Sequence, residues 1–166
     1  MTAVHWIVQR MLAREAVVAV GKRLVPRTDV RLHRMTNGRL SLPAMGGVNM
    51  LLLTTTGRRS GLERVTPLLY VRDGDDFCVV GSNWGNPTQP AWALNLLADP
   101  NAAVDVGGER IAVTARHLTG ADRAAAWSRL VRVWPPYDSY AAKAKDRELL
   151  VFLLRRATAK PSKARR

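Results

Sequence analysis

Only one cysteine, Cys78, occurs among the 166 residues, so the chain can form no intramolecular disulfide. Cys78 lies in an apolar stretch and is expected to be buried and chemically inert. The three histidines, His5, His33 and His117, are scattered, and the sequence contains neither C-x-x-C nor H-E-x-x-H. Zinc and related metals need clustered ligands of these types, so no metal site is expected.

Long apolar runs are also lacking. No run reaches the roughly 18 residues that a membrane-spanning helix requires. The N-terminus shows no compact apolar core followed by a small-residue cleavage site, so no signal peptide is expected. A chain of this length suits one domain and can bury a sizeable core without disulfides or metals.

Several catalytic signatures are absent as well. Without a G-x-S-x-G elbow, the sequence does not fit a serine hydrolase. The dinucleotide fingerprint G-x-G-x-x-G is missing, and the stretch GRRSGLER at residues 57–64 lacks the Gly-Lys-Ser/Thr of a Walker phosphate loop. Common nucleotide-binding folds are therefore not indicated.

Acidic residues are scarce, with 13 against 26 Lys and Arg, and the net charge is +13. The excess is confined to the two ends: residues 1–50 carry +6, residues 51–154 carry +1, and residues 155–166 carry +6. This distribution favours basic appendages that touch an anionic surface over a basic groove through the core.

Residues 2–25 are predicted to form a helix with an apolar stripe at helical spacing. Two interpretations stay open, a helix packed on the domain and a basic amphipathic helix lying on a membrane. Residues 26–48 contain several Pro and Gly residues and are expected to form a connecting segment between the helix and the domain. The chain thus divides into an N-terminal helix with connecting segment (1–48), a domain (49–155) and a basic tail (156–166).

From residue 49 onward the pattern is one of short strands joined by tight turns. One helix is expected over residues 91–98, beginning after Pro90. A second is expected over residues 123–133, where Thr119 to Asp122 fit a helix-capping pattern. The segment WPPYDSY ends this second helix. Strands are expected over residues 49–55, 64–71, 77–82, 102–106, 110–115 and 148–154. This order predicts an antiparallel curled sheet or small barrel with helices outside it.

The turn between the first two strands contains Arg58 and Arg59 between Gly57 and Gly61, and Arg64 follows just after it. Glycine turns can present backbone N–H groups to an anion. Arginine adds bidentate donors that match phosphate or carboxylate, and the neighbouring serine adds a hydroxyl. The alternative is a solvated hairpin tip with no ligand.

Three stretches, TTGRRSGLERVTPLLYVRDGD, VVGSNWGNPTQPAWALNLLADP and WPPYDSY, resemble the deazaflavin-dependent nitroreductase family in order and spacing. The resemblance covers roughly residues 30–155. It implies an actinobacterial enzyme of the α+β class with an FMN-binding-like split β-barrel of about six mostly antiparallel strands and peripheral helices. Members use reduced coenzyme F-420, and many behave as quinone reductases.

The resemblance also implies a coenzyme site. Coenzyme F-420 is an 8-hydroxy-5-deazaflavin with a phosphate and a poly-glutamate tail, so the arginine turn gains an anionic partner. Family members often carry lysine where this chain has Arg59. The implied coenzyme contacts are Arg58, Arg59, Ser60, Arg64, Val65, Thr66, Pro67, Leu68, Leu69, Val80, Gly81, Ser82, Asn83, Ala91, Trp92, Ala93, Leu94, Asn95 and Tyr137.

Tyr137 and Ser82 are the candidate catalytic residues. The two prolines before Tyr137 restrict the backbone, so its phenol can be held in a fixed direction to orient the substrate or relay a proton. The alternative is a tyrosine that only packs against the barrel. Some family members carry a tyrosine at the position of Leu69, where it lines the substrate pocket. A leucine predicts a more apolar pocket, which leaves quinones as substrates and places nitroimidazoles in question.

The leading hypothesis is therefore an F-420-dependent reductase of a quinone, an activated alkene or a nitro compound. One alternative is a split barrel that binds FMN. Another is a non-enzymatic basic protein that binds anionic lipid or nucleic acid. Split barrels often pair, so a homodimer is possible, and the expected location is the cytoplasm or the inner face of the cell membrane. The sequence does not name the physiological oxidant.

Overall fold

The computed structural model describes residues 49–157. The predicted helix at 2–25, the connecting segment and nearly all of the basic tail lie outside the described residues. Seven strands are present in the described part: β1 (Met50–Thr56), β2 (Glu63–Leu69), β3 (Val71–Asp73), β4 (Asp76–Val80), β5 (Asn101–Val106), β6 (Glu109–Leu118) and β7 (Val151–Arg156). Its helices are η2 (Asn83–Gly85), α3 (Ala91–Ala98), α4 (Gly120–Val133) and α5 (Pro136–Lys143).

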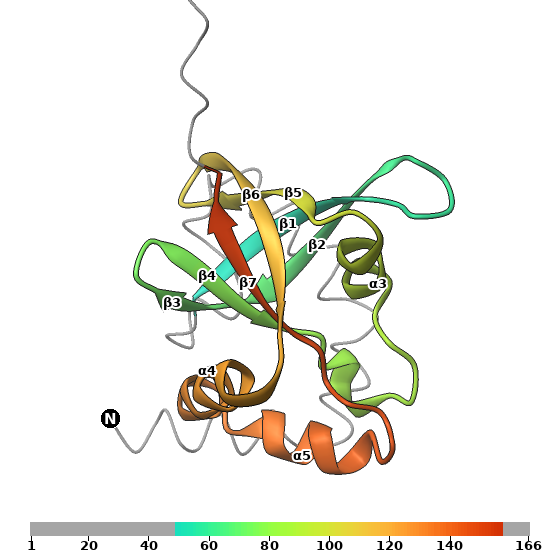
Figure 1. The fold of residues 1–166 in the computed structure, drawn as a ribbon, viewed down its shortest axis with the longest axis vertical. Helices are drawn as coiled ribbons and strands as arrows, with labels where there is room; N and C mark the ends of the chain where they lie inside the picture. Colours follow the sequence, from blue (N-terminus) through green and yellow to red (C-terminus); the bar gives the residue numbers. More distant parts are fainter. Residues whose placement is uncertain (1–48, 158–166) are drawn as a thin grey trace, which may run out of the picture.

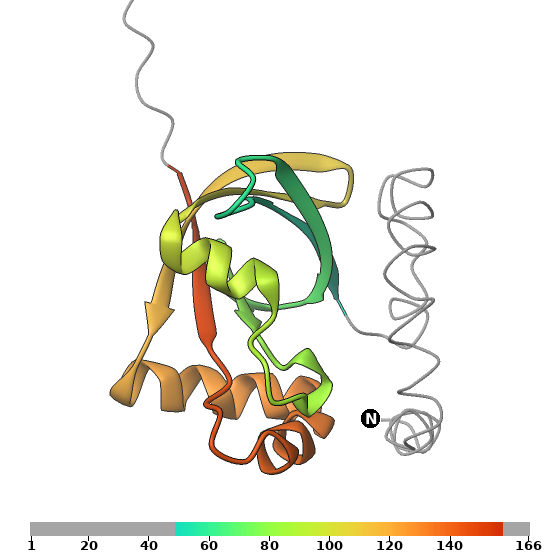
Figure 2. The same ribbon diagram turned by 90° about the vertical axis from the view of Figure 1, so that its right-hand side faces the viewer.

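The seven strands form one sheet in the order β2-β1-β5-β6-β7-β4-β3, and every neighbouring pair is antiparallel. The sheet curls on itself as a half-barrel, with α3 lying across its open side and α4 and α5 beneath it (Figures 1 and 2). Short turns join three of the pairs, β1–β2, β3–β4 and β5–β6, whereas the other three pairs bring together strands that are distant in the sequence. The predicted α+β curled sheet is confirmed.

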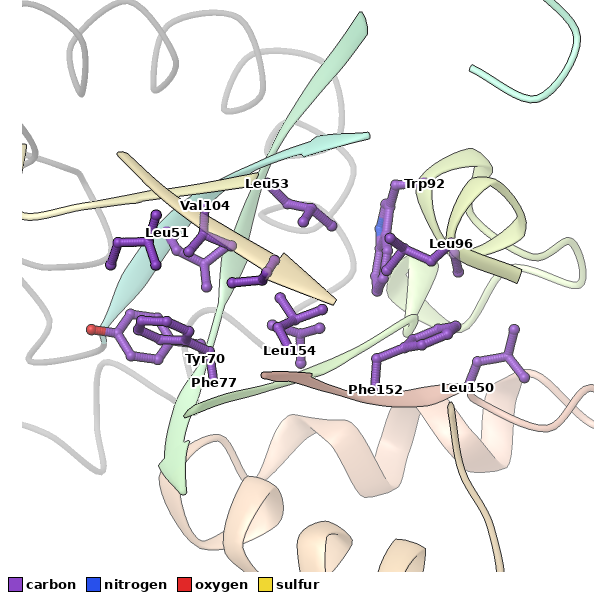
Figure 3. Packing of buried hydrophobic residues seen from close by; sticks show 14 residues of the cluster. Leu51, Leu53, Tyr70, Phe77, Trp92, Leu96, Val104, Leu150, Phe152 and Leu154 are labelled. Carbon is purple, nitrogen blue, oxygen red and sulfur yellow. The ribbon is translucent and has the colours of Figure 1, made fainter. Parts of the chain in front are cut away.

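The concave side of the sheet holds the inner core. Alternate residues of each strand point inward, among them Leu51, Leu53 and Phe152, and Trp92 and Leu96 of α3 close the space from the side (Figure 3). The ring centroids of Trp92 and Phe152 are 5.8 Å apart. Because a strand alternates faces at every residue, this inner set leaves a second apolar set on the convex side.

The convex side forms an outer core with α4 and α5. Cys78 and Val80 of β4 and Leu153 of β7 pack there against Leu130 of α4 and Tyr137 of α5. Burial raises the pKa of the Cys78 thiol to about 11. A raised pKa keeps the thiol protonated at neutral pH, and the expected burial of Cys78 is confirmed.

Some boundaries differ from the prediction. The expected strand at 64–71 is two strands, because the chain changes partner at Tyr70: β2 pairs with β1, and β3 pairs with β4. This accounts for seven strands where about six were expected. The last strand begins at Val151, three residues later than predicted, and a helix, α5, begins at Pro136 within the WPPYDSY segment.

The predicted capping pattern before α4 is not realised through side chains. Thr119 is the N-cap residue of α4, yet its side chain makes no capping hydrogen bond. Asp122 instead accepts a bond from the Arg116 guanidinium at 2.8 Å. Both groups are exposed, so this pair contributes little to the free energy of unfolding.

Candidate functional site

The arginine turn is a tight loop closed by backbone hydrogen bonds. The Gly57 N–H donates to the Leu62 carbonyl at 2.8 Å, and the Gly61 N–H donates to the Gly57 carbonyl at 2.7 Å. Gly61 has φ +67°, a left-handed conformation that glycine adopts without strain. A Cβ on Gly57 would lie 2.8 Å from Ser60 Oγ and 3.1 Å from the Leu62 carbonyl, so a larger residue there would force the turn to adjust. The turn therefore has a defined shape that depends on both glycines.

Asn95 of α3 anchors this turn to the rest of the fold. Its side chain is 3% exposed; Oδ1 accepts a hydrogen bond from the Arg58 N–H at 3.2 Å, and Nδ2 donates to Thr55 Oγ1 at 3.1 Å. A buried amide that satisfies a loop N–H and a strand hydroxyl fixes both relative to the helix. Figure 1 shows the turn next to α3. Two segments of the predicted coenzyme site are thus brought together.

The three arginines of the turn have no acidic partner in the described part of the chain. Arg58, Arg59 and Arg64 are exposed, and within residues 49–157 no carboxylate lies within salt-bridge distance of them. Glu63, their neighbour in sequence, is oriented toward Arg110 at 3.5 Å. Other arginines of the fold do find carboxylates, such as Arg129, which donates to both oxygens of Asp73 at 2.8 Å. The turn is thus a cluster of cations free to bind an anion.

Strand β2 presents one free backbone edge beyond the turn. Within the described residues, β2 pairs with β1 alone. The Tyr70 N–H donates toward β1, to the Asn49 carbonyl at 3.1 Å. Because N–H and C=O groups alternate sides along a strand, the polar groups of Val65, Pro67 and Leu69 face away from β1. Pro67 has no N–H to donate, which suits an edge position.

The end of β4 packs closely against the start of α3. The Gly81 N–H donates to the Leu150 carbonyl at 2.8 Å, and a Cβ on Gly81 would lie 3.2 Å from Pro90 Cγ and 3.5 Å from Ala93 Cβ. The structure therefore places Gly81 beside the first turn of α3, as the predicted site requires. Among the predicted contacts in this helix, Trp92, Ala93 and Asn95 are buried, whereas Ala91 is exposed and Leu94 is half-buried.

Ser82 and Asn83 stand at the start of an unusual loop. Asn83, Trp84 and Gly85 have φ values of +44°, +56° and +73°, so three successive residues adopt left-handed conformations. Such conformations cost non-glycine residues roughly 1–3 kcal/mol each and persist only where the surroundings hold them. The Trp84 ring packs edge-on against Tyr140 of α5, with centroids 5.9 Å apart.

Sequence analysis missed Arg147, whose guanidinium holds this loop. Nε donates to the Asn86 carbonyl at 2.8 Å, Nη1 to the Gly81 carbonyl at 3.0 Å, and Nη2 to the Ser82 carbonyl at 2.7 Å. Partial burial lowers the pKa of Arg147, although an arginine stays charged at neutral pH. These partners are 61 to 66 residues away along the chain, so no local pattern marked Arg147.

Tyr137 lies apart from the arginine turn, in the outer core. It is 5% exposed, and its ring centroid is 6.3 Å from that of Trp127 and 6.2 Å from that of Tyr140. Burial raises its pKa well above the usual range of a phenol. Tyr137 and Leu69 both line an apolar crevice that is packed too closely to hold even a water molecule. The other lining residues are Tyr70, Val71, Leu130, Val133 and Trp134.

One group of the predicted residues follows β2, while a second group lies at the end of β4 and in α3. The cationic turn lies at the start of β2, and the crevice of Leu69 and Tyr137 lies at its end. The five steps from Arg64 to Leu69 span roughly 17 Å at about 3.4 Å per residue. Within residues 49–157, no group of three or more His, Cys, Asp or Glu side chains is arranged to hold a metal ion. The arrangement suits a long ligand with an anionic end and an apolar end.

Comparison with solved structures defines the class of fold. A structure described as an F420-H2 dependent reductase (FDR-A) superposes with a TM-score of 0.59 at 36% identity, covering 64% of this chain and 93% of that one. A second, described as a domain-swapped dimer, has a TM-score of 0.62 at 34% identity and covers 77% and 93%. The half-barrel is therefore that of the split-barrel reductases.

Sequence comparison then identifies the family. A family model described as F420H(2)-dependent quinone reductase matches residues 24–156, and the chain belongs to this family. An F420H(2)-dependent quinone reductase of Mycobacterium tuberculosis is 41% identical over 97 residues. That alignment covers 58% of this chain and 64% of the relative, just under two thirds of its length.

Proposed function

We propose that the chain is an oxidoreductase that uses reduced coenzyme F-420 to reduce a quinone. The observation that carries the proposal is the edge of β2 that pairs with no second strand among residues 49–157. At one end of β2 stand three arginines without a carboxylate partner in those residues, and at the other end lies the apolar crevice of Leu69 and Tyr137. The coenzyme has the same polarity, an anionic phosphate and poly-glutamate tail at one end and a deazaflavin ring at the other. When bound, it supplies the hydride.

In this proposal the residues of the chain bind and orient the coenzyme. Arg58, Arg59 and Arg64 bind the anionic groups through charged hydrogen bonds. The outward-facing backbone groups of β2 contact the middle of the ligand, and the Gly81–Asn83 segment borders the ring. This division of roles needs no metal and no nucleophile, in keeping with a protein that positions a coenzyme and excludes water.

Tyr137 and Ser82 are proposed to contact the substrate. Because burial raises the pKa of Tyr137, its phenol stays protonated and suits hydrogen-bond donation to a quinone oxygen better than proton transfer. The backbone carbonyl of Ser82 is bound by Arg147, while its hydroxyl is left to donate to the ring or the substrate. With Leu69 the crevice is apolar, which favours a quinone over a nitroimidazole.

Fluorescence titration with F-420 and with FMN tests the proposed coenzyme. We expect F-420 to bind at micromolar affinity or better and FMN at least tenfold more weakly, because FMN has a phosphate but no poly-glutamate tail to engage the arginines. Oxidation of reduced F-420 by menadione, monitored by absorbance, is expected only with the protein present. Equal affinity for FMN would favour an FMN-binding barrel, and failure to bind either would favour a non-enzymatic basic protein.

We also propose peripheral contact with anionic membranes. Within residues 49–157, no helix is both long and apolar enough to cross a membrane. The proposal rests on the cations of residues 1–25 and 155–166, since each basic residue near an anionic bilayer contributes about 1 kcal/mol and salt screens that attraction. We expect salt-sensitive co-sedimentation with anionic but not neutral vesicles, and we expect deletion of residues 1–25 to weaken it while coenzyme binding persists. Protein left in the supernatant with both vesicle types would contradict it.

The structural neighbour described as a domain-swapped dimer supports a homodimer for this chain. We propose this assembly for the protein in solution. Light scattering coupled to gel filtration decides between a monomer and a dimer.

A further inference from the structure

The guanidinium of Arg147 makes more polar contacts than any predicted site residue. Besides the carbonyls of Gly81, Ser82 and Asn86, it donates from Nη1 to Gln89 Oε1 at 3.0 Å. Gln89 in turn donates from Nε2 to the Glu148 carbonyl at 2.8 Å. The Arg147 side chain therefore binds both ends of the 81–89 loop, and Gln89 donates a hydrogen bond to the segment that contains Arg147.

No carboxylate among residues 49–157 forms a salt bridge with this cation. Glu148 follows Arg147 in sequence, yet its carboxylate pairs with Arg123 at 2.8 Å. Arg147 thus directs its charge at backbone carbonyls, and its planar fork of donors sets where those carbonyls point. A lysine ammonium carries its three donors on a single nitrogen, so it cannot reproduce the spread, planar arrangement by which the guanidinium reaches three carbonyls.

The loop needs to be held, because its backbone is strained. Asn83 and Trp84 are left-handed without being glycine, and Gly85 completes the run. Gly85 is also enclosed, since a Cβ there would lie 2.9 Å from both the Tyr140 carbonyl and Lys143 Cβ. Strained conformations of this kind gather at functional sites where the surroundings over-determine them. The carbonyls that Arg147 binds lie on either side of the strained residues.

We propose that Arg147 is a positioning residue for the coenzyme, holding the strained loop so that Ser82 and Asn83 border the ring. The proposal rests on the proposed function, because the ring is placed there by the F-420 assignment. Arg147 acts through the loop backbone and does not touch the coenzyme itself. Its loss releases the carbonyls on both sides of Asn83 and lets the loop relax to ordinary backbone conformations.

The test compares Arg147→Met and Arg147→Lys with Arg123→Met. Arg123 is a fair control, because it too is partly buried and bonds a carbonyl of the same segment, that of Leu149 at 3.3 Å. We expect the dissociation constant for F-420 to rise at least tenfold in both Arg147 variants, without rescue by lysine, and to stay within twofold of wild type in the control.

Hydrogen exchange gives a second readout that does not depend on the coenzyme. The Gly85 N–H donates to the Ser82 carbonyl and the Asn86 N–H to the Asn83 carbonyl, each at 2.9 Å. We expect exchange at these two amides to accelerate in the ligand-free Arg147 variants and not in Arg123→Met. If Arg147→Met does not fold, Gln89→Ala removes one partner of the guanidinium and is expected to change both readouts in the same direction.

The outcomes separate the two proposals. Wild-type protein that fails to bind F-420 would refute the proposed function itself. Wild-type binding that survives in both Arg147 variants would overturn only the positioning role. Unchanged exchange at Gly85 and Asn86 in folded Arg147 variants would overturn it equally, since the loop would then hold its shape without the guanidinium.

Discussion

Replacing Arg59 or Arg64 with alanine is expected to weaken F-420 binding by about 1.5–3 kcal/mol per residue, the loss of one charged hydrogen bond. Each variant then raises the dissociation constant roughly 10- to 160-fold, and the double variant by at least 100-fold. The physical reason is that both guanidinium groups are exposed and lack a carboxylate in the described structure, so a bound anion is their partner. Fluorescence quenching by F-420 measures the effect.

Thermal stability is expected to change little in the same variants, because an exposed side chain without an ion pair contributes little to the folded state. Arg132→Ala is the matched control: it removes the same charge from the exposed last turn of α4. If Arg132→Ala weakens binding as much as Arg59→Ala, the turn is not a specific site. A large fall in melting temperature with unchanged affinity would make the turn arginines structural.

The strands and the turn were predictable because their signals are local. Gly57 and Gly61 mark the hairpin turn, and the apolar runs on both sides mark its strands, so pattern alone places β1 and β2. The family resemblance then supplied the split barrel, which the sheet order and the solved neighbours confirm. The partner change at Tyr70 was missed because nothing in the sequence of residues 64–71 marks a break between two strands. The break appears only when the sheet curls and β3 pairs with β4 while β2 pairs with β1.

The parts of the candidate site that escaped prediction depend on long-range contacts. Asn95 was predicted as a coenzyme contact, yet its side chain is buried and bonds the Arg58 N–H and Thr55, 37 and 40 residues earlier. Arg147 lies in the charged stretch KDRE, which resembles a solvated surface segment. Its role emerges only where folding brings the 81–89 loop beside it. Residues that hold a site through the backbone leave no motif of their own.

Tyr137→Phe is expected to lower the turnover of menadione by about 2- to 13-fold, the loss of one neutral hydrogen bond of roughly 0.5–1.5 kcal/mol. The variant keeps the aromatic ring in its contacts with Trp127 and Tyr140, so the outer core and the affinity for F-420 are expected to be preserved. Steady-state kinetics with reduced F-420 and menadione measure the effect, alongside a coenzyme titration.

Tyr70→Phe is the comparison variant, because it removes the same hydroxyl from a second buried tyrosine of the same lining, whose ring packs in the inner core 5.4 Å from Phe77. If the effect belongs to the Tyr137 hydroxyl, turnover is expected to fall more in Tyr137→Phe than in Tyr70→Phe. The pH profile adds a second check on Tyr137. Since burial raises its pKa above that of an ordinary phenol, the phenol stays protonated as pH rises, and wild-type turnover is expected to show no loss from its ionisation between pH 7 and about 9.5. Turnover that is equal in wild type and Tyr137→Phe would assign Tyr137 to packing, and the quinone would then be oriented by Ser82 or by the coenzyme alone.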